Sequence, residues 1–167
     1  MKAFIVLLAF ITVGLTACGQ SDKPAGPNPY YSRTDTQQLH VDNATWKKIL
    51  SPDLYAVARE GATERAFTGK YWNTDDRGTY YCAVCGNPLF RSTAKFSSEC
   101  GWPSFFQPLR KNATVYLEDH SLGMDRIEVR CGRCGSHLGH IFDDGPPPTH
   151  KRYCMNSVSL EFVPDKK

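Results

Sequence analysis

The residues of this chain that are best suited to chemistry are its seven cysteines. Because seven is odd, disulfide pairing cannot use all of them, and each cysteine needs its own assignment. Four of them lie in two copies of a Cys-x-x-Cys-Gly pattern, at 82–86 and 131–135. The other three, Cys18, Cys100 and Cys154, stand in unrelated local sequences and must serve other purposes.

The two Cys-x-x-Cys-Gly segments are typical of metal knuckles. This spacing lets two sulfurs face one point, and the glycine permits a tight turn whose amides can point at the thiolates. Four thiolates close a tetrahedral site and leave no position for a substrate, so the metal is expected to be structural. Iron fits the same ligands, and two short-loop disulfides are the alternative in an exported protein. We predict a zinc ion bound by Cys82, Cys85, Cys131 and Cys134.

Cys100 and Cys154 are left for redox chemistry once the four metal ligands and Cys18, which belongs to the N-terminal leader region, are set aside. A structural disulfide between them is the alternative, and cysteine counting alone gives both interpretations similar weight in an oxidising compartment. The alternation along 152–162 predicts a strand whose even positions, apolar from Val158 onward, face the core.

The same even positions carry a guanidinium, a thiol and an amide, at Arg152, Cys154 and Asn156. Packing alone would select aliphatic residues here, so these polar groups indicate a site. The cation of Arg152 favours the thiolate form of Cys154, which is the stronger nucleophile. Asn156 is expected to hydrogen-bond substrate or a water near it.

Two histidines, His137 and His140, follow the second knuckle in a turn that contains glycine. A single histidine is more often a packed core residue, but this pair predicts a proton donor and its orienting partner. Trp102, between a glycine and a proline, offers a flat indole for a small methyl-bearing ligand, although indoles more often serve the core.

These residues must be positioned by short elements. Trp46, Ile49 and Leu50 have helical spacing, and Ser51 can cap a second short helix that ends near Gly61. After the second helix the sequence consists of short alternating runs separated by turn residues, which indicates antiparallel β structure. The runs are 78–84, 114–117, 126–131 and 152–162.

The first 17 residues have the form of a secretory signal, with Lys2 ahead of an apolar run at 3–15. The run is shorter than the roughly 20 residues of a membrane-spanning helix, and a buried core helix is the other alternative. The sequence before Cys18 resembles a bacterial lipoprotein processing site, which would leave Cys18 as an acylated first residue. We therefore expect a protein of the bacterial cell envelope, anchored by lipid and facing the periplasm.

The remaining chain divides into a tether at 18–40, rich in proline and polar residues, and one domain at 41–167. The composition, 41% hydrophobic and 22% charged, suits a globular core. A net charge of +3 provides no basic stripe for a phosphate backbone, so no nucleic-acid partner is expected. We expect a monomer.

Four motifs together resemble the methionine-R-sulfoxide reductases of the B type, and the resemblance runs from about Trp46 to Phe162. The motifs are the segments 63–69, 100–105, 137–146 and 152–157. The resemblance implies an all-β fold of two antiparallel sheets with short N-terminal helices, a zinc ion in the four cysteines, and recycling by a thioredoxin-like reductant. Family members often carry glycine where this chain has Glu99, a departure next to Cys100.

By motif position, the resemblance implies that Cys154 is the nucleophile and Cys100 the resolving cysteine. Cys154 attacks the sulfoxide sulfur of methionine-R-sulfoxide while His140, helped by His137, protonates the departing oxygen. Cys154 becomes a sulfenic acid, which condenses with Cys100 to a disulfide that an external dithiol reduces. Trp102 packs the substrate methyl group. The expected role is repair of oxidised envelope proteins.

Two other functions remain as alternatives at this point. One is a general thiol-disulfide oxidoreductase that uses a Cys-x-x-Cys pair, which would have to stay free of metal. The other is a zinc-ribbon binding module without catalysis, which leaves Cys100 and Cys154 unexplained. The sequence does not distinguish free methionine sulfoxide from oxidised residues in proteins, and it does not identify the reductant.

Overall fold

The computed structural model describes residues 27–166. The expected signal peptide at 1–17, the lipidation site Cys18 and the tether up to residue 26 lie outside these residues. Among the described residues, no helix combines the length and apolar character needed to cross a membrane.

Two short helices open the fold, as predicted. Helix α1, Asn43–Ile49, is capped by the preceding residue Asp42, whose side chain accepts a hydrogen bond from the amide of Thr45. Helix α2, Pro52–Glu60, is capped by the Ser51 hydroxyl. It ends at Gly61, whose φ of 74° lies in the left-handed region that favours glycine.

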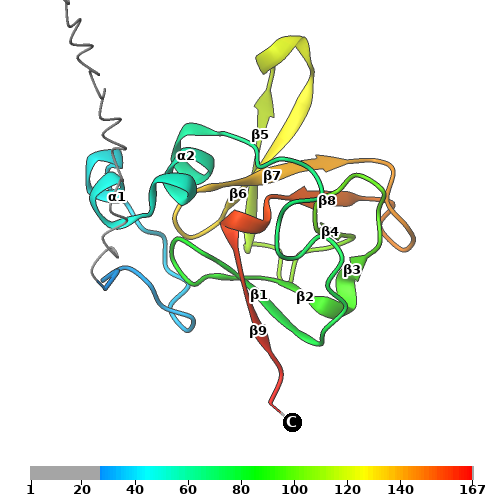
Figure 1. The fold of residues 1–167 in the computed structure, drawn as a ribbon, viewed down its shortest axis with the longest axis horizontal. Coiled ribbons are helices and arrows are strands. Elements are labelled where there is room, and N and C mark those ends of the chain that lie inside the picture. Colours follow the sequence, from blue (N-terminus) through cyan, green and yellow to red (C-terminus); the bar gives the residue numbers. More distant parts are fainter. Residues whose placement is uncertain (1–26, 167) are drawn as a thin grey trace, which may run out of the picture.

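The strands form two antiparallel sheets, which confirms the predicted fold class (Figure 1). The smaller sheet has the order β2-β1-β9 and the larger one β3-β4-β8-β7-β6-β5. In chain order the strands are β1 Gly78–Cys82, β2 Pro88–Arg91, β3 Lys95–Phe96, β4 Ser104–Phe105, β5 Thr114–Asp119, β6 Arg126–Cys131, β7 His137–Phe142, β8 Arg152–Met155 and β9 Leu160–Pro164.

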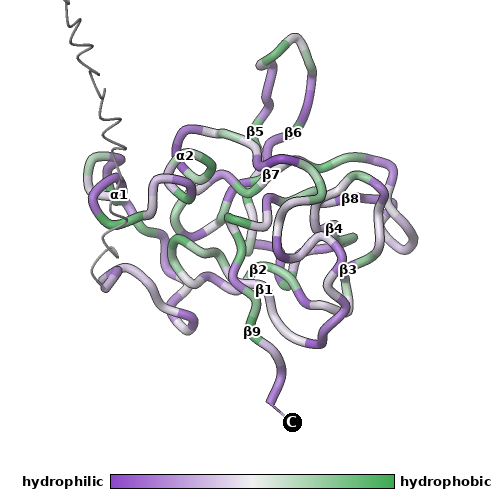
Figure 2. Tube along the Cα trace, viewed as in Figure 1, coloured by the Kyte–Doolittle hydropathy of each residue, from purple (hydrophilic) through white to green (hydrophobic). Residues whose placement is uncertain are grey.

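Aromatic side chains join the two sheets. Phe90 on β2 stacks on Phe105 of β4, with ring centroids 4.3 Å apart, and Tyr80 of β1 meets Phe105 edge-on at 4.9 Å. All three rings are fully buried. The hairpin of β5 and β6 extends away from this core (Figures 1 and 2). Its strands pair from Thr114 opposite Cys131 to Asp119 opposite Arg126.

The prediction of one continuous strand over 152–162 is wrong. A 3-10 turn at Ser157–Ser159 separates β8 from β9, and the two strands belong to different sheets. Because of the turn, the core-facing positions of β8 and β9 do not follow one alternation. In β9 the even position Leu160 is buried, whereas in β8 the odd positions Tyr153 and Met155 face the core. Cys154 therefore lies on the face opposite to these core residues. Glu64, distant in sequence, holds the turn because its carboxylate accepts hydrogen bonds from the first two amides.

The packed part of the chain extends further toward the N-terminus than the expected boundary at residue 41. The main-chain amide of Ser32 donates to the Cys85 carbonyl at 3.0 Å. The buried guanidinium of Arg133 donates to the carbonyl of Tyr30 and to the carboxylate of Asp35. A buried guanidinium needs acceptors, and the segment 28–39 supplies them.

Candidate active site and metal centre

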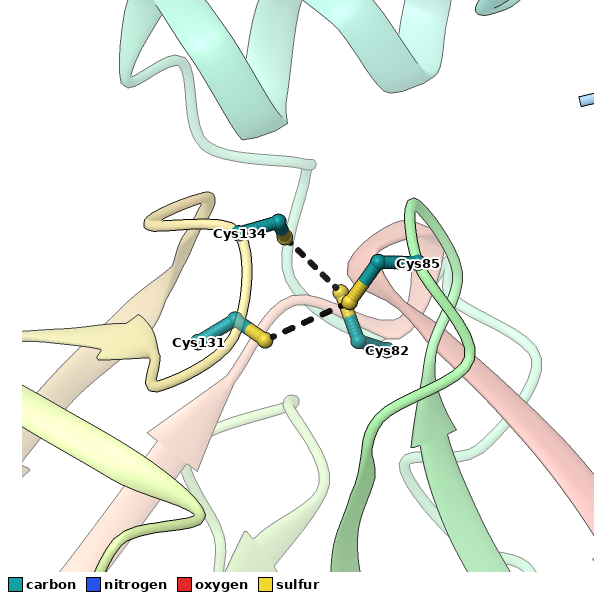
Figure 3. A group of neighbouring side chains, drawn as sticks. All are labelled: Cys82, Cys85, Cys131 and Cys134. Carbon is teal, nitrogen blue, oxygen red and sulfur yellow. Dashed lines mark hydrogen bonds between the residues drawn. The ribbon is translucent and has the colours of Figure 1, made fainter. Parts of the chain in front are cut away.

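The four knuckle cysteines lie in one buried cluster (Figure 3). Each knuckle starts at the end of a strand, β1 or β6, and turns at a glycine in the left-handed region, with φ of 76° at Gly86 and 67° at Gly135. The amide of each glycine donates to the carbonyl of the knuckle's first cysteine. The local turn thus directs both sulfurs of a knuckle to the same side.

The spacing of the sulfurs fits a tetrahedral metal site. The Sγ atoms of Cys82 and Cys134 are 3.8 Å apart, those of Cys85 and Cys131 are 3.6 Å apart, and all four lie within 4.8 Å of one another. Sulfurs around a zinc ion with bonds of about 2.3 Å lie about 3.8 Å apart. These contacts join different knuckles, so the alternative of a disulfide within each Cys-x-x-Cys pair does not describe the cluster. The donor set is that of a closed structural site.

Cys100, in the loop before β4, and Cys154, on β8 of the large sheet, lie side by side. Their Sγ atoms are 3.6 Å apart, and neither forms a disulfide. In the sheet register Cys154 lies between Ser104 on β4 and His140 on β7. A disulfide bond of about 2.0 Å can form from this contact by a small shift of either side chain.

The surroundings of the pair shift the pKa values of the two thiols in opposite directions, so Cys100 ionises before Cys154. Hydrogen bonds from Cys154, and then from Ser104 and Ser98, lower the pKa of Cys100 to about 4 against the opposing effect of burial. The contact with Cys100 and burial raise the pKa of Cys154, while the charge of Arg152 acts in the opposite direction. In the dithiol form, the effect that Arg152 is expected to have on Cys154 is therefore opposed by Cys100 and by burial.

Arg152 is held near the pair by its own contacts. Its Nε and Nη2 donate to the two carboxylate oxygens of Asp144 at 2.8 and 2.7 Å. Its guanidinium lies over the ring of Phe142, 4.5 Å from the centroid. The Arg152 side chain is only 14% exposed, so its charge is poorly screened from Cys154.

A cavity of about 120 Å³ opens at Cys154. Trp102, His140 and Asn156, all predicted site residues, contribute to its wall together with Cys154. The Trp102 indole donates to the carbonyl of Glu64 at 3.1 Å, which fixes the ring. Such a small cavity with an apolar wall suits a methyl sulfide or a methyl sulfoxide.

The two predicted histidines differ in their access to this cavity. His140 lines it, and its Nε2 lies 2.7 Å from the Asp119 carboxylate. His137 is 5% exposed and does not line it, and its Nδ1 lies 2.7 Å from the Glu128 carboxylate. Burial lowers the pKa of His137 and favours its neutral form. The ring centroids of the two histidines are 5.4 Å apart.

Comparison with known proteins extends over most of the chain. A family model described as SelR domain matches residues 50–164. The chain belongs to the SelR-domain family. Three relatives carry the name "Peptide methionine sulfoxide reductase MsrB". The protein from Pseudomonas savastanoi pv. phaseolicola is 56% identical over 119 residues, which cover 71% of this chain and 91% of the relative.

The other two relatives give similar values. The protein from Methylibium petroleiphilum is 53% identical over 137 residues, or 81% of this chain and 99% of the relative. The protein from Agrobacterium fabrum is 49% identical over 127 residues, or 76% and 94% of the two chains. The similarity therefore includes both the metal centre and the cavity of this SelR-domain chain.

Asp119 and Arg126 belong to the site of this SelR domain but carry no motif in the sequence. They face each other at the base of the turn between β5 and β6, and Arg126 Nη2 lies 2.7 Å from the Asp119 carboxylate. Hydrogen bonds from Ser121, followed by that from His140 and the charge of Arg126, lower the pKa of Asp119. The carboxylate is therefore ionised and can orient the imidazole of His140. In the sequence, only the opposite charges of Asp119 and Arg126 on either side of a turn could have indicated that these residues belong to the site.

Asn156 is placed at the SelR-domain cavity but its amide is already engaged. Its Oδ1 accepts from the amide of Glu64 at 3.0 Å, and its Nδ2 donates to the carbonyl of Leu138 at 3.1 Å. These bonds tie β7 and the segment after α2 to the end of β8. They indicate that Asn156 shapes the cavity, in addition to any contact it makes with substrate.

Replacing Asp119 with asparagine is expected to slow sulfoxide reduction by roughly 10- to 100-fold, because the imidazole of His140 loses the carboxylate that orients it. Steady-state rates measure the loss. Asp125→Asn is the matched control, since Asp125 is exposed on the same hairpin and bonds only His120. Equal rates in the two variants would show that Asp119 does not contribute to the reaction.

Proposed function

We propose that this chain reduces methionine-R-sulfoxide to methionine through its two redox cysteines. The observation that carries the proposal is the contact of 3.6 Å between Cys154 and Cys100 beside a cavity that also presents His140. The names of the SelR-domain relatives support the same reaction.

The first step takes place at Cys154. When substrate enters the cavity, Cys154 passes its proton to the Cys100 thiolate 3.6 Å away and attacks the sulfoxide sulfur as a thiolate, while His140 protonates the departing oxygen. The bond between the two sulfurs then breaks as the oxygen moves to Cys154, so methionine leaves and the cysteine becomes a sulfenic acid. Trp102 packs the methyl group of the substrate, and Arg152 supports the negative charge on Cys154 with its own charge.

The second step joins the two sulfurs. The Cys100 thiolate attacks the Cys154 sulfenic acid, the S–S bond forms and the S–O bond breaks, and hydroxide leaves and takes up a proton. The disulfide must then be reduced by an external dithiol, which we propose to be thioredoxin-like. The short distance between the sulfurs supports an intramolecular reaction.

The four-cysteine cluster lies apart from this chemistry in the proposal. Cys82, Cys85, Cys131 and Cys134 would hold zinc, which ties together two knuckles that are distant in sequence. All four are buried, which argues against a Cys-x-x-Cys pair that exchanges with other thiols.

The cellular setting is proposed from the sequence alone. The signal-like first 17 residues and Cys18 support a lipid-anchored protein of the bacterial envelope. Its substrates would then be oxidised methionines of envelope proteins, free methionine sulfoxide, or both.

Supplying the two sulfoxide diastereomers separately, with dithiothreitol as reductant, tests the proposed reaction. The expected result is methionine from the R form only, measured by chromatography of the products. Protein without zinc and heat-inactivated protein are the controls. Methionine from the S form alone, or from neither form, would contradict the proposed function.

Removal of the metal is expected to lower Tm by roughly 10 °C or more, because the two knuckles lose their common ion. Elemental analysis should find about one zinc per chain before treatment with a strong chelator. Calorimetry before and after treatment measures the change, and zinc added back should restore it. A metal-free protein of unchanged Tm would remove the four cysteines from the proposed zinc site.

A further inference from the structure

Two serine hydroxyls lie against the sulfur of Cys100. Ser98 Oγ is 3.0 Å from Cys100 Sγ, and Ser104 Oγ is 3.5 Å from the same sulfur. The two hydroxyl oxygens are 2.6 Å apart. Ser104 is fully buried, whereas Ser98 is half-buried in the loop before Cys100. The steps described above assign no role to either serine.

The hydrogen bonds that this cluster can form depend on whether Cys100 is a thiol or a thiolate. The thiol can donate to the carbonyl of Trp102, which lies 3.6 Å from Cys100 Sγ. A thiolate has nothing to donate and instead needs donors. Ser98 can supply one to the sulfur. The Ser104 hydroxyl lies 3.3 Å from the Trp102 carbonyl and 2.6 Å from Ser98, so it can turn its proton from the carbonyl to Ser98, and such a chain strengthens each bond. The Trp102 carbonyl favours the thiol, whereas the serines and the main-chain hydrogen bond at Trp102 favour the thiolate.

We propose that Ser98, supported by Ser104, is a positioning residue that holds Cys100 as a thiolate for the resolving step. The inference rests on the proposed function, because the thiolate is needed only if Cys100 attacks an oxidised Cys154. In that attack the Cys100 sulfur is oxidised and the Cys154 sulfur is reduced. The S–S bond replaces the S–O bond, and the released hydroxide becomes water by taking a proton.

The hydrogen bonds from Ser98 and Ser104 have their largest effect on the pKa of Cys100 once Cys154 no longer donates to it. In the dithiol form the thiol of Cys154 is the first cause of the lowered pKa of Cys100, followed after burial by Ser104 and Ser98. After the first step Cys154 is a sulfenic acid and no longer offers that thiol. Ser98 and Ser104 remain in place.

The charged groups around Cys100 are few. Arg152 on β8 interacts with its charge, and Cys154 on the same strand is the titratable neighbour. Glu99, next in sequence, has an exposed side chain. A shift caused by Ser98 can therefore be separated from the effects of these groups with single variants.

The test measures the acidity of Cys100 without any sulfoxide. Zinc-loaded full-length protein carrying Cys154→Ser is alkylated with iodoacetamide between pH 4 and 9, and mass spectrometry follows the peptide that contains Cys100. Adding Ser98→Ala should move the midpoint upward by about one pH unit, which slows alkylation about tenfold below the midpoint. Ser97→Ala, at the exposed neighbouring position, is the control and should leave the profile unchanged.

Ser98→Thr keeps a hydroxyl and should restore the original midpoint, which a purely structural role of Ser98 would not explain. In the otherwise native chain, Ser98→Ala should still release about one methionine per chain without reductant but form the disulfide about tenfold more slowly at pH 5. An unchanged alkylation profile in Ser98→Ala would overturn the inference. A shifted profile, combined with a native chain that reduces neither sulfoxide diastereomer, would support the role of Ser98 and contradict the proposed function instead.

Discussion

Replacing Cys154 with serine should abolish methionine formation, with a loss on the order of 10³-fold or more. A hydroxyl is a far weaker nucleophile than a thiolate, and the charge of Arg152 that favours an ionised thiol is insufficient to ionise a serine. Single-turnover assays with the R-sulfoxide and rapid quenching measure the loss. Zinc content and Tm should stay unchanged, because Cys154 lies apart from the metal cluster.

The matched control for this variant is Ser159→Ala, which removes a buried hydroxyl from the turn after β8 and leaves both redox sulfurs in place. It should keep the first turnover. Substantial methionine formation by Cys154→Ser would show that another group attacks the sulfoxide.

Replacing Cys100 with serine should separate the two steps. The first turnover should survive, with about one methionine per chain, because attack and oxygen transfer precede the resolving step. Loss of Cys100 also removes the main cause of the raised pKa of Cys154, which leaves burial as the remaining cause and the charge of Arg152 acting against it. Turnover with thioredoxin should then stop, since no intramolecular disulfide forms, while a small thiol partly restores it.

Product counts over time with each reductant measure this division. Loss of the first turnover, as severe as in Cys154→Ser, would contradict the assignment of separate roles. Full turnover with thioredoxin in Cys100→Ser would show that a different cysteine resolves the sulfenic acid.

Features set by neighbouring residues could be predicted from the sequence. The two caps of helix α2, Ser51 and Gly61, depend only on their immediate neighbours, and both lie where the pattern placed them. The knuckles likewise depend on a turn within five residues, with the glycines at 86 and 135 in the conformation that the pattern requires. Strand β6 has the predicted bounds, because its alternation is interrupted only at its ends.

Features that depend on distant residues could not be predicted in this way. The break after β8 depends on Glu64, which lies far away in sequence and holds the 3-10 turn through two amides. Alternation read through that turn assigned Cys154 to the core face. The family resemblance implies that Cys154 reacts with Cys100, and the structure places their sulfurs 3.6 Å apart. Asp119 and Arg126 become site residues only when the β5–β6 hairpin pairs and meets β7.

The contacts of the segment 28–39 also depend on distant residues and could not be predicted from the sequence. Its proline and polar residues indicate a tether, yet it supplies acceptors to the buried Arg133 between the cysteines of the second knuckle. Nothing near residue 35 in the sequence indicates that a guanidinium almost a hundred positions later needs its carboxylate.

The most direct test of the central claim uses the reduced, zinc-loaded protein without any reductant. After reaction with excess R-sulfoxide, methionine is counted and the cysteines are mapped by mass spectrometry. The account predicts about one methionine per chain, one disulfide between Cys100 and Cys154, and four unmodified knuckle cysteines with zinc retained. A disulfide within a Cys-x-x-Cys pair together with zinc release, or methionine formed while Cys154 stays a free thiol, would contradict it.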